Sequence, residues 1–397
     1  MNLWSTNTPH NFWQCQPDPS EDIWQNAVLG APSLLGLTDT QTDTDALLAL
    51  TLGEARFGQK HWTLSLPKKV YYLLKPALPR YLIGLLRRGY HHSKKTESEI
   101  QWPVEQHYVV FLWEVLTRIV QANPDHQVLI KSLWPDNQHF AFVLTHDVET
   151  KSGLEYVRRV ADLEEGLGFR SSFNFVPERY QLNLNLMDEL RNRGFEIGIH
   201  GLKHDGKLFN SRKEFGRRAN RINHYLKKYG AVGFRTPLTH RNPEWMQALD
   251  VEYDLSFFDT DPFEPIPGGT MSIWPFFVGH FVELPYTLVQ DYTLTSVLGE
   301  TTPKVWLEKV DFIEKYFGMA LVNSHPDYLS ESTTWNVYRQ FLTSMKERNG
   351  YWQALPSDVA NWWRKRMSTD AENTGVQIPL VRVVLEGDTL QMTNLPS

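Results

Sequence analysis

The sequence predicts an α/β fold in which a parallel β-sheet curls into a barrel. From residue 138 onward, short apolar segments alternate regularly with amphipathic helical patterns, which is typical of parallel strands joined by helical crossovers. Seven or eight such units follow one another, enough to close a barrel. The 397 residues are 41% hydrophobic and 22% charged, so a large core can form and disorder is excluded as the main state.

The segment at 140–146 is apolar almost throughout, as expected of a strand that is buried on both faces. It predicts the first strand of the barrel. The same reading predicts further strands at 171–176, 195–199, 233–235, 251–256, 281–284, 319–323 and 351–354. Helical spacing of apolar residues predicts helices at 153–167, 184–192, 211–228, 244–249, 303–316 and 334–348.

Three parts of the chain are distinguished. Residues 1–137 form a mostly helical accessory region, with helical patterns at 45–52 and 107–122, and they carry no catalytic motif. Residues 138–368 form the barrel. Residues 369–397 form a tail whose alternating pattern predicts a β-hairpin that turns at Glu386-Gly387-Asp388.

Charge and cysteine content restrict the function. Forty Lys and Arg residues against 46 Asp and Glu residues give a net charge of −6, so no basic excess draws the chain to nucleic acid. The single cysteine, Cys15, cannot form an internal disulfide, and any metal must be held by histidine and carboxylate. The first residues lack the basic and apolar regions of a signal peptide, so we expect a cytoplasmic protein.

Residues 68–95 combine a proline-interrupted apolar stretch with flanking Lys and Arg residues. The stretch is shorter than the roughly 20 apolar residues that a spanning helix needs. Two interpretations are open. The preferred one is a helical pair that packs on the main domain and exposes a solvated basic face. The other is a basic amphipathic element that makes peripheral contact with the anionic inner face of the membrane.

Polar residues at the carboxyl ends of two predicted strands mark a candidate site, because barrel enzymes assemble their sites at that rim. In the segment 145–149, Asp147 and Glu149 alternate, so both carboxylates face one side of an extended chain and repel unless a cation or proton lies between them. In the segment 195–205, His200 and His204 lie four residues apart, so that one helical turn would bring both to a single face.

Glu149, His200 and His204 together offer one carboxylate and two imidazoles, a ligand set suited to zinc or another first-row divalent ion with an open position for water. An HxxxH pair alone is weak evidence, since such histidines are often solvent-facing or capping. Its combination with the two carboxylates points to a metal site. Asp147 is then the spare carboxylate, suited to act as a general base.

Six segments in order resemble the motif series of the polysaccharide deacetylases, the NodB-homology group of carbohydrate esterase family 4, and more specifically its cytoplasmic branch in surface-polysaccharide biosynthesis. The segments are Thr145-His-Asp-Val-Glu149, His200-Gly-Leu-Lys-His204, Gly233-Phe-Arg-Thr-Pro237, Tyr253-Asp-Leu-Ser256, Glu283-Leu-Pro285 and Leu321-Val-Asn-Ser-His-Pro326. The resemblance covers residues 138–366. It implies a distorted (β/α) barrel and a divalent metal, with zinc the favoured ion.

The resemblance also implies roles. Asp147 matches the catalytic base of the family, and His200 and His204 match its metal ligands. Arg235 matches the arginine that orients the base, and His325 matches the general acid. The last two roles each have a purely structural alternative. Arg235 could form a structural ion pair with some other acid, and His325 could cap the turn before Pro326.

Two positions depart from the family pattern. Glu149 stands where the third metal ligand of the family is an aspartate, and its extra methylene changes the reach of the carboxylate. Leu238 stands where many members have a tyrosine, although its backbone N–H can still contribute to an oxyanion hole.

The function indicated is a metal-dependent deacetylase that acts on an acetylated carbohydrate, either an amino sugar or an O-acetylated sugar of a polysaccharide or its precursor. Two alternatives stay open. One is a non-catalytic glycan-binding protein on the same barrel, and the other is an amidohydrolase that acts on a small non-sugar amide.

Overall fold

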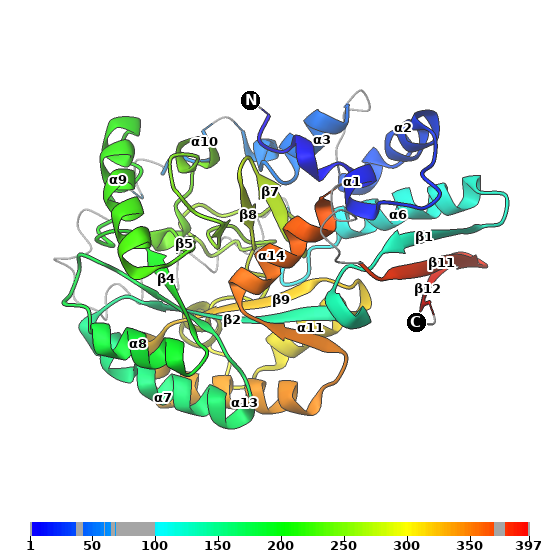
Figure 1. Ribbon diagram of the computed structural model, residues 1–397. Helices are drawn as coiled ribbons and strands as arrows, with labels where there is room; N and C mark the ends of the chain where they lie inside the picture. Colours follow the sequence, from blue (N-terminus) through cyan, green and yellow to red (C-terminus); the bar gives the residue numbers. More distant parts are fainter. Residues whose placement is uncertain are drawn as a thin grey trace.

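The computed structural model describes residues 2–36, 43–58, 60–64, 68, 100–368 and 378–395. The N-terminal helices lie together at one side of the barrel (Figure 1). Helix α6 is the longest of them and buries one stripe of side chains, against which α2 and the turn η2 pack. The elements are η1 (Ser5–Asn7), α1 (Pro9–Trp13), α2 (Glu21–Leu29), η2 (Pro32–Leu35), α3 (Thr44–Leu50), η3 (Ala55–Phe57) and α6 (His107–Ala122).

The barrel is built on a sheet of nine strands in the described part of the chain. The strand order is β10-β2-β3-β4-β5-β6-β8-β7, and β9 also pairs with β2. All neighbours are parallel except β7 and β8. The strands are β2 (Phe140–Val148), β3 (Ser172–Phe175), β4 (Glu196–His200), β5 (Gly233–Arg235), β6 (Tyr253–Asp254), β7 (Phe276–Val278), β8 (Phe281–Glu283), β9 (Met319–Ser324) and β10 (Tyr351–Ala354).

The segment after β8 connects the two ends of the curled sheet. Tyr286 forms an isolated bridge with Phe258, and Leu288 forms another with Val322 in β9. The Thr287 hydroxyl accepts from the Leu321 N–H of β9 at 3.0 Å and donates to the carbonyl oxygen of Met319, in the same strand, at 2.7 Å. At this point single bridges, and not a full ladder of hydrogen bonds, close the barrel, so the barrel is irregular. The predicted distorted (β/α) barrel is therefore confirmed.

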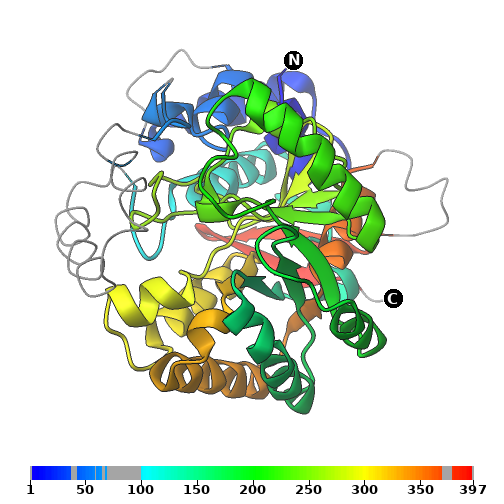
Figure 2. The same cartoon turned by 90° about the vertical axis from the view of Figure 1, so that its left-hand side faces the viewer.

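Helices cover the outer face of the barrel (Figure 2). Thr150 and Ser211 cap two of them, because each side chain accepts a backbone N–H of the first turn. All nine residues of β2 are buried, as its apolar sequence predicts. The helices are α7 (Lys151–Leu167), α8 (Leu184–Asn192), α9 (Arg212–Tyr229), α10 (Pro243–Met246), α11 (Lys304–Lys315), α12 (Pro326–Leu329), α13 (Ser332–Glu347) and α14 (Pro356–Met367).

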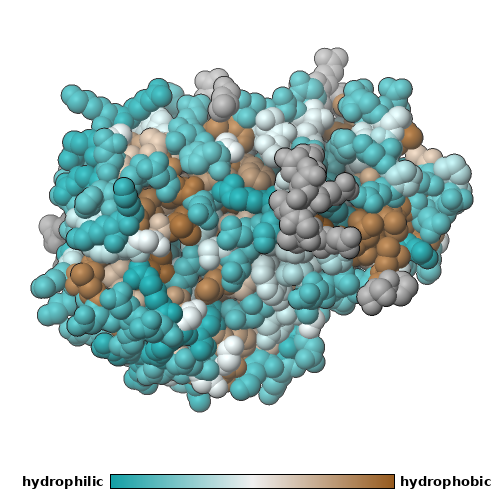
Figure 3. Space-filling model, in the orientation of Figure 1, coloured by the Kyte–Doolittle hydropathy of each residue, from teal (hydrophilic) through white to brown (hydrophobic). Residues whose placement is uncertain are grey.

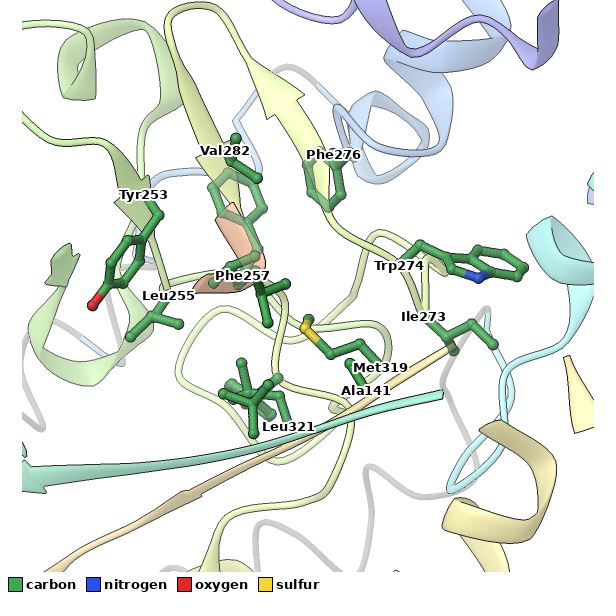
Figure 4. Packing of buried hydrophobic residues seen from close by; sticks show 14 of the residues in the cluster. Ala141, Tyr253, Leu255, Phe257, Ile273, Trp274, Phe276, Val282, Met319 and Leu321 are labelled. Carbon is green, nitrogen blue, oxygen red and sulfur yellow. The ribbon is translucent and has the colours of Figure 1, made fainter. Parts of the chain in front are cut away.

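One hydrophobic core runs through the N-terminal helices and the barrel. In Figure 4, side chains from β2, β6, β7, β8 and β9 converge with those of the long connections between them, and Trp274 and Phe276 face the N-terminal region. The face of the molecule seen in Figure 3 is covered mainly by hydrophilic residues, and its hydrophobic residues lie in separate patches.

The N-terminal segment covers the edge strand β7. The Asn7 side chain donates to the carbonyl oxygen of Phe277 at 2.8 Å and accepts from the Phe277 N–H at 2.7 Å. Gly279 just beyond β7 donates to the carbonyl oxygen of Leu3. An edge strand exposes unpaired backbone groups that pair with other chains, and the Asn7 amide satisfies one N–H and one C=O in the way a neighbouring strand would.

The predicted C-terminal hairpin is confirmed. Strands β11 (Leu380–Glu386) and β12 (Thr389–Asn394) pair antiparallel, and β11 also pairs with β1 (Gln127–Lys131). The predicted elements did not include β1, β7, α1, α2, α12 or α14. Strand β1 depends on β11, a partner about 250 positions away in sequence, and β7 has three residues, too few for a period to register.

Among the described residues, no helix is long and apolar enough to cross a membrane. The segment at 68–95, which was interpreted either as packing on the main domain or as contacting a membrane, lies outside the described residues except for Lys68. The ammonium group of Lys68 donates to the carbonyl oxygen of Pro265 in the barrel at 2.5 Å.

We predict that Asn7→Ala lowers the free energy of unfolding by about 1–3 kcal/mol, because it removes two part-buried hydrogen bonds to the backbone of Phe277 in β7. Urea denaturation measures the change. Asn11→Ala is the matched control, since the Asn11 side-chain amide donates to the carbonyl oxygen of Thr6 in an exposed hydrogen bond, and its effect should stay within about 0.5 kcal/mol. Equal effects of the two substitutions would contradict the role of Asn7.

Candidate metal centre and active site

The structure brings all six candidate residues to one rim of the barrel. Asp147 is the second-last residue of β2 and Glu149 follows that strand, His200 ends β4, Arg235 ends β5, and His325 follows β9. These ends meet because parallel strands present their carboxyl ends at the same edge. His204 completes the set from the loop after β4, and its Nε2 lies 2.9 Å from Oε1 of Glu149.

Glu149, His200 and His204 form a group that is able to hold a metal ion. Each offers one ligand atom, and these atoms all lie within 4.8 Å of one another. The Nε2 atom of His200 is buried and accepts no hydrogen bond from the described residues. A buried nitrogen without a partner costs free energy, so these donors fit a divalent ion that would bind the lone pair.

The remaining nitrogen of His200 is already engaged. Its Nδ1 lies 3.2 Å from the carbonyl oxygen of Arg235, which makes Nδ1 the protonated nitrogen and leaves Nε2 with a lone pair. Burial lowers the pKa of His200 to about 4, although the nearby Asp147 carboxylate opposes the change. The imidazole is therefore neutral, as a metal ligand must be.

The predicted route by which the two histidines meet is wrong in one respect. They are not joined by a helical turn: His200 ends β4, and His204 lies in the irregular loop that follows, in which Gly201 has φ +60° and His204 has φ +52°. Two left-handed residues reverse the chain sharply, and the two rings still approach to 5.0 Å between centroids. At Gly201 a Cβ would lie 2.4 Å from Cγ of Pro237, so only glycine fits there.

Glu149 is held by its backbone as well as by its side chain. Asp327 in α12 accepts the Glu149 N–H at 3.0 Å and also accepts the Thr150 hydroxyl. At Gly153 a Cβ would lie 2.1 Å from the Asp327 carboxylate, so the close approach of α7 and α12 requires glycine. Burial alone would raise the pKa of Glu149, but the adjacent His204 holds it well below its ordinary value.

Asp147 is a buried carboxylate that the surrounding donors keep ionised. Its Oδ1 accepts from Arg235 at 3.2 Å and from Asn174 at 3.1 Å, and its Oδ2 accepts from Asn323 at 3.1 Å. Burial raises the pKa of Asp147, but Arg235 and then His200 outweigh burial and bring it to about 2. The partner of Arg235 is thus the carboxylate that the resemblance assigns as the base.

His325 faces both carboxylates from the opposite side. Its Nε2 lies 4.0 Å from Oδ2 of Asp147 and 3.9 Å from Oε1 of Glu149. Its Nδ1 lies 2.7 Å from Oδ1 of Asp291, and its backbone N–H donates to Oδ2 of the same residue at 2.9 Å. Burial would lower the pKa of His325, but Asp291 raises it to about 10.

The sequence reasoning missed Asp291, Asn174 and Asn323 as parts of the site. The two asparagines carry a signal, since each is a polar residue near the carboxyl end of an apolar strand. Asp291 carries none. It lies in the connection between β8 and α11, and only the closure of the barrel places it beside His325.

No protein-family model matches the sequence, and no curated protein is similar to it. Among solved structures, the chain is similar to a protein described as a probable polysaccharide deacetylase from Pseudomonas aeruginosa PAO1. The TM-score is 0.50 and the sequences are 15% identical, over 59% of this chain and 94% of that one.

Two further structures match at a TM-score of 0.49. One is described as a putative polysaccharide deacetylase from Mycobacterium smegmatis, at 18% identity over 60% of this chain and 95% of that one. The other is a PuuE allantoinase, at 14% identity over 61% and 94%. The match to the Pseudomonas protein shows that the two chains share a barrel fold, and the chemistry must be argued from the residues at the rim.

We predict that the purified chain binds about one divalent ion, and that His200→Ala removes most of it without unfolding the barrel. Elemental analysis after desalting measures the bound metal, and circular dichroism checks the fold. His224→Ala is the control, since His224 is exposed on α9 and should leave the metal content unchanged. Full metal content in the His200→Ala protein would refute the assignment.

Proposed function

We propose that this chain is a metal-dependent carbohydrate deacetylase, which hydrolyses acetyl groups from an amino sugar or an O-acetylated sugar of a polysaccharide or its precursor. One observation carries the proposal. Beside the three candidate metal ligands lie a carboxylate that stays ionised, Asp147, and an imidazole that stays protonated, His325. Acyl transfer needs this division into a base and an acid. The six ordered motifs support the same reaction.

The ligands of the metal are Glu149, His200 and His204, and zinc suits one carboxylate with two imidazoles. When bound, a divalent ion there would polarise the acetyl carbonyl and make a water molecule more acidic. Glu149 in place of the aspartate of the family retains a carboxylate at 2.9 Å from His204, so the departure preserves the donor set.

Asp147 is the proton acceptor for the attacking water. Its three hydrogen-bond donors fix the carboxylate in one orientation and keep it deprotonated at neutral pH. Arg235 acts through Asp147, as the guanidinium is fully buried and holds the carboxylate by an ion pair at 3.2 Å. Its position supports a role in the site over a purely structural ion pair.

His325 is the proton donor to the departing amine or alcohol. Asp291 binds Nδ1, so the proton on Nε2 faces the two carboxylates and the space where a leaving group would depart. The alternative role of His325 as a turn cap is not supported, because its side chain makes no cap hydrogen bond to α12. The backbone N–H of Leu238 is our candidate for stabilising the oxyanion.

We predict that the wild-type protein releases acetate from acetylated sugars and that Asp147→Asn slows the release by roughly 10²–10⁴-fold, as expected for the loss of a general base. The substrates are an N-acetylated chitin oligomer, an O-acetylated xylan oligomer and acetamide. Asp147→Asn should keep its metal, whereas Glu149→Ala should lose metal and activity together.

The same assay separates the alternatives. A glycan-binding protein without catalysis would release no acetate from any substrate, and an amidohydrolase for small amides would prefer acetamide to both oligomers. If Asp147→Asn loses its metal while Glu149→Ala keeps it, the roles of the two carboxylates must be exchanged.

We predict that Asp291→Asn shifts the alkaline limb of the rate to lower pH. In the wild type, His325 keeps its proton until the pH approaches about 10, because Asp291 outweighs the effect of burial. Without that charge, burial lowers the pKa, and the acid form is lost as the pH rises through a lower value. The pH profile of kcat measures the shift, with Asp188→Asn on the exposed face of α8 as control. An unchanged alkaline limb would remove His325 from the acid role.

A further inference from the structure

A buried ion pair joins the N-terminal region to the rim of the barrel. Arg241, in the loop after β5, donates from Nε to Oε2 of Glu54 at 2.9 Å and from Nη2 to Oε1 at 2.5 Å. Both side chains are fully buried. Glu54 lies in the N-terminal region, 187 positions away in sequence. The two-pronged geometry is the strongest contact that a guanidinium makes with a carboxylate.

The surroundings leave each charge dependent on the other. The guanidinium of Arg241 lies over the rings of Phe258, Trp62 and Phe257, at 4.4, 5.1 and 5.2 Å from their centroids. His61 also contacts the carboxylate of Glu54, with Nε2 at 3.3 Å from Oε1. Removing one partner would leave a buried charge with little compensation, which is strongly unfavourable.

The ion pair holds a strained turn. Leu238 has φ +60° and Thr239 has φ +49°, a conformation that side-chain-bearing residues rarely adopt and that is most unusual for a β-branched residue. Strain of this kind persists only where neighbours impose it. Arg241 donates from Nη1 to the carbonyl oxygen of Thr239 at 3.0 Å, and the Thr239 hydroxyl donates to Glu264 at 2.6 Å.

This strained turn lies against the loop that carries the two candidate metal ligands. Pro237 packs so closely on Gly201, the neighbour of His200, that no Cβ fits there. Two residues after His204 in the sequence, a Cβ at Gly206 would lie 3.8 Å from Cδ1 of Leu238. A shift of the turn would therefore move one wall of the site.

We propose that Glu54 is a positioning residue of this site: through Arg241 it fixes the strained turn at Leu238 and Thr239, which forms the wall beside His200 and His204. The inference rests on the proposed function in treating the site as catalytic. The N-terminal region would then help to position the site. Among the described residues, the carboxylate that binds Arg241 is that of Glu54, and it comes from the N-terminal region and not from the barrel.

The test compares Glu54→Gln with the wild type by hydrogen exchange and by kinetics. The amide keeps the size of the side chain and loses its charge. We expect the backbone amides of residues 236–241 to exchange at least about tenfold faster. We expect kcat to fall by about 10–100-fold at unchanged metal content, because small displacements of a site cost this much.

Arg366→Gln is the matched control. Arg366 is also fully buried and also joins the N-terminal region to the rest of the chain, by donating to the carbonyl oxygens of Phe12 and Ser132. It should lower stability while leaving kcat and the exchange at 236–241 as in the wild type. If both variants reduce kcat equally, Glu54 has a structural role only, and the proposal is overturned.

Two further variants keep the test decisive. Arg241→Lys keeps the charge and loses the two-pronged contact. It should show the same faster exchange at 236–241, and it takes the place of Glu54→Gln in the test if that variant does not fold. In the double variant Glu54→Gln/Arg241→Gln, the loss in kcat should not exceed the larger single loss, whereas independent roles would give additive losses. Wild-type exchange in a folded Glu54→Gln protein would overturn the inference. Absence of acetate release by the wild type would refute the proposed function alone, since the exchange comparison does not need activity.

Discussion

The rim of the barrel depends on one buried guanidinium, that of Arg235. It donates to the carbonyl oxygen of Leu255 after β6, to the side chains of Thr145 and Asp147 in β2, and to Oδ1 of Asn323 in β9. Arg235 itself ends β5, so one side chain binds the ends of several strands together. A fully buried cation is tolerated only when its donors are satisfied. The strand ends are consequently fixed relative to one another, and the side chains that face the site are fixed with them.

The buried acids around this cation differ in the direction of their pKa shifts. Asp147 faces Arg235 and two amide donors, and its pKa falls to about 2. Asp254 and Glu283 lie at the adjacent strand ends β6 and β8 and face each other. Burial raises the pKa of both, and the charge of Asp254 raises that of Glu283 further. Both carboxyl groups are therefore shifted toward the protonated form. The environment alone decides which carboxyl is available as a base.

The parts of this structure that the sequence could predict are those encoded in short stretches. The apolar run of β2, the polar residues at its end and the order of the six motifs are local signals, and they predicted the barrel and brought six residues to attention. Contacts between distant segments leave no such signal. The pairing of His325 with Asp291 and of Arg241 with Glu54 follows from barrel closure and from the docking of the N-terminal helices. The loop between His200 and His204 was missed because left-handed residues, and not a helical period, bring the rings together.

The N-terminal region completes the barrel in a physical sense. Asn7 satisfies the backbone of β7, and Glu54 neutralises Arg241 beside the strained turn. The β7 backbone groups are part-buried and Arg241 is fully buried, and each would lose its partner if the region were displaced. The first contact lies at an edge strand that pairs within its sheet on one side only, and the second lies at the wall of the site. Stability of the edge and placement of the site are therefore supplied by the same part of the chain, although it carries no motif of its own.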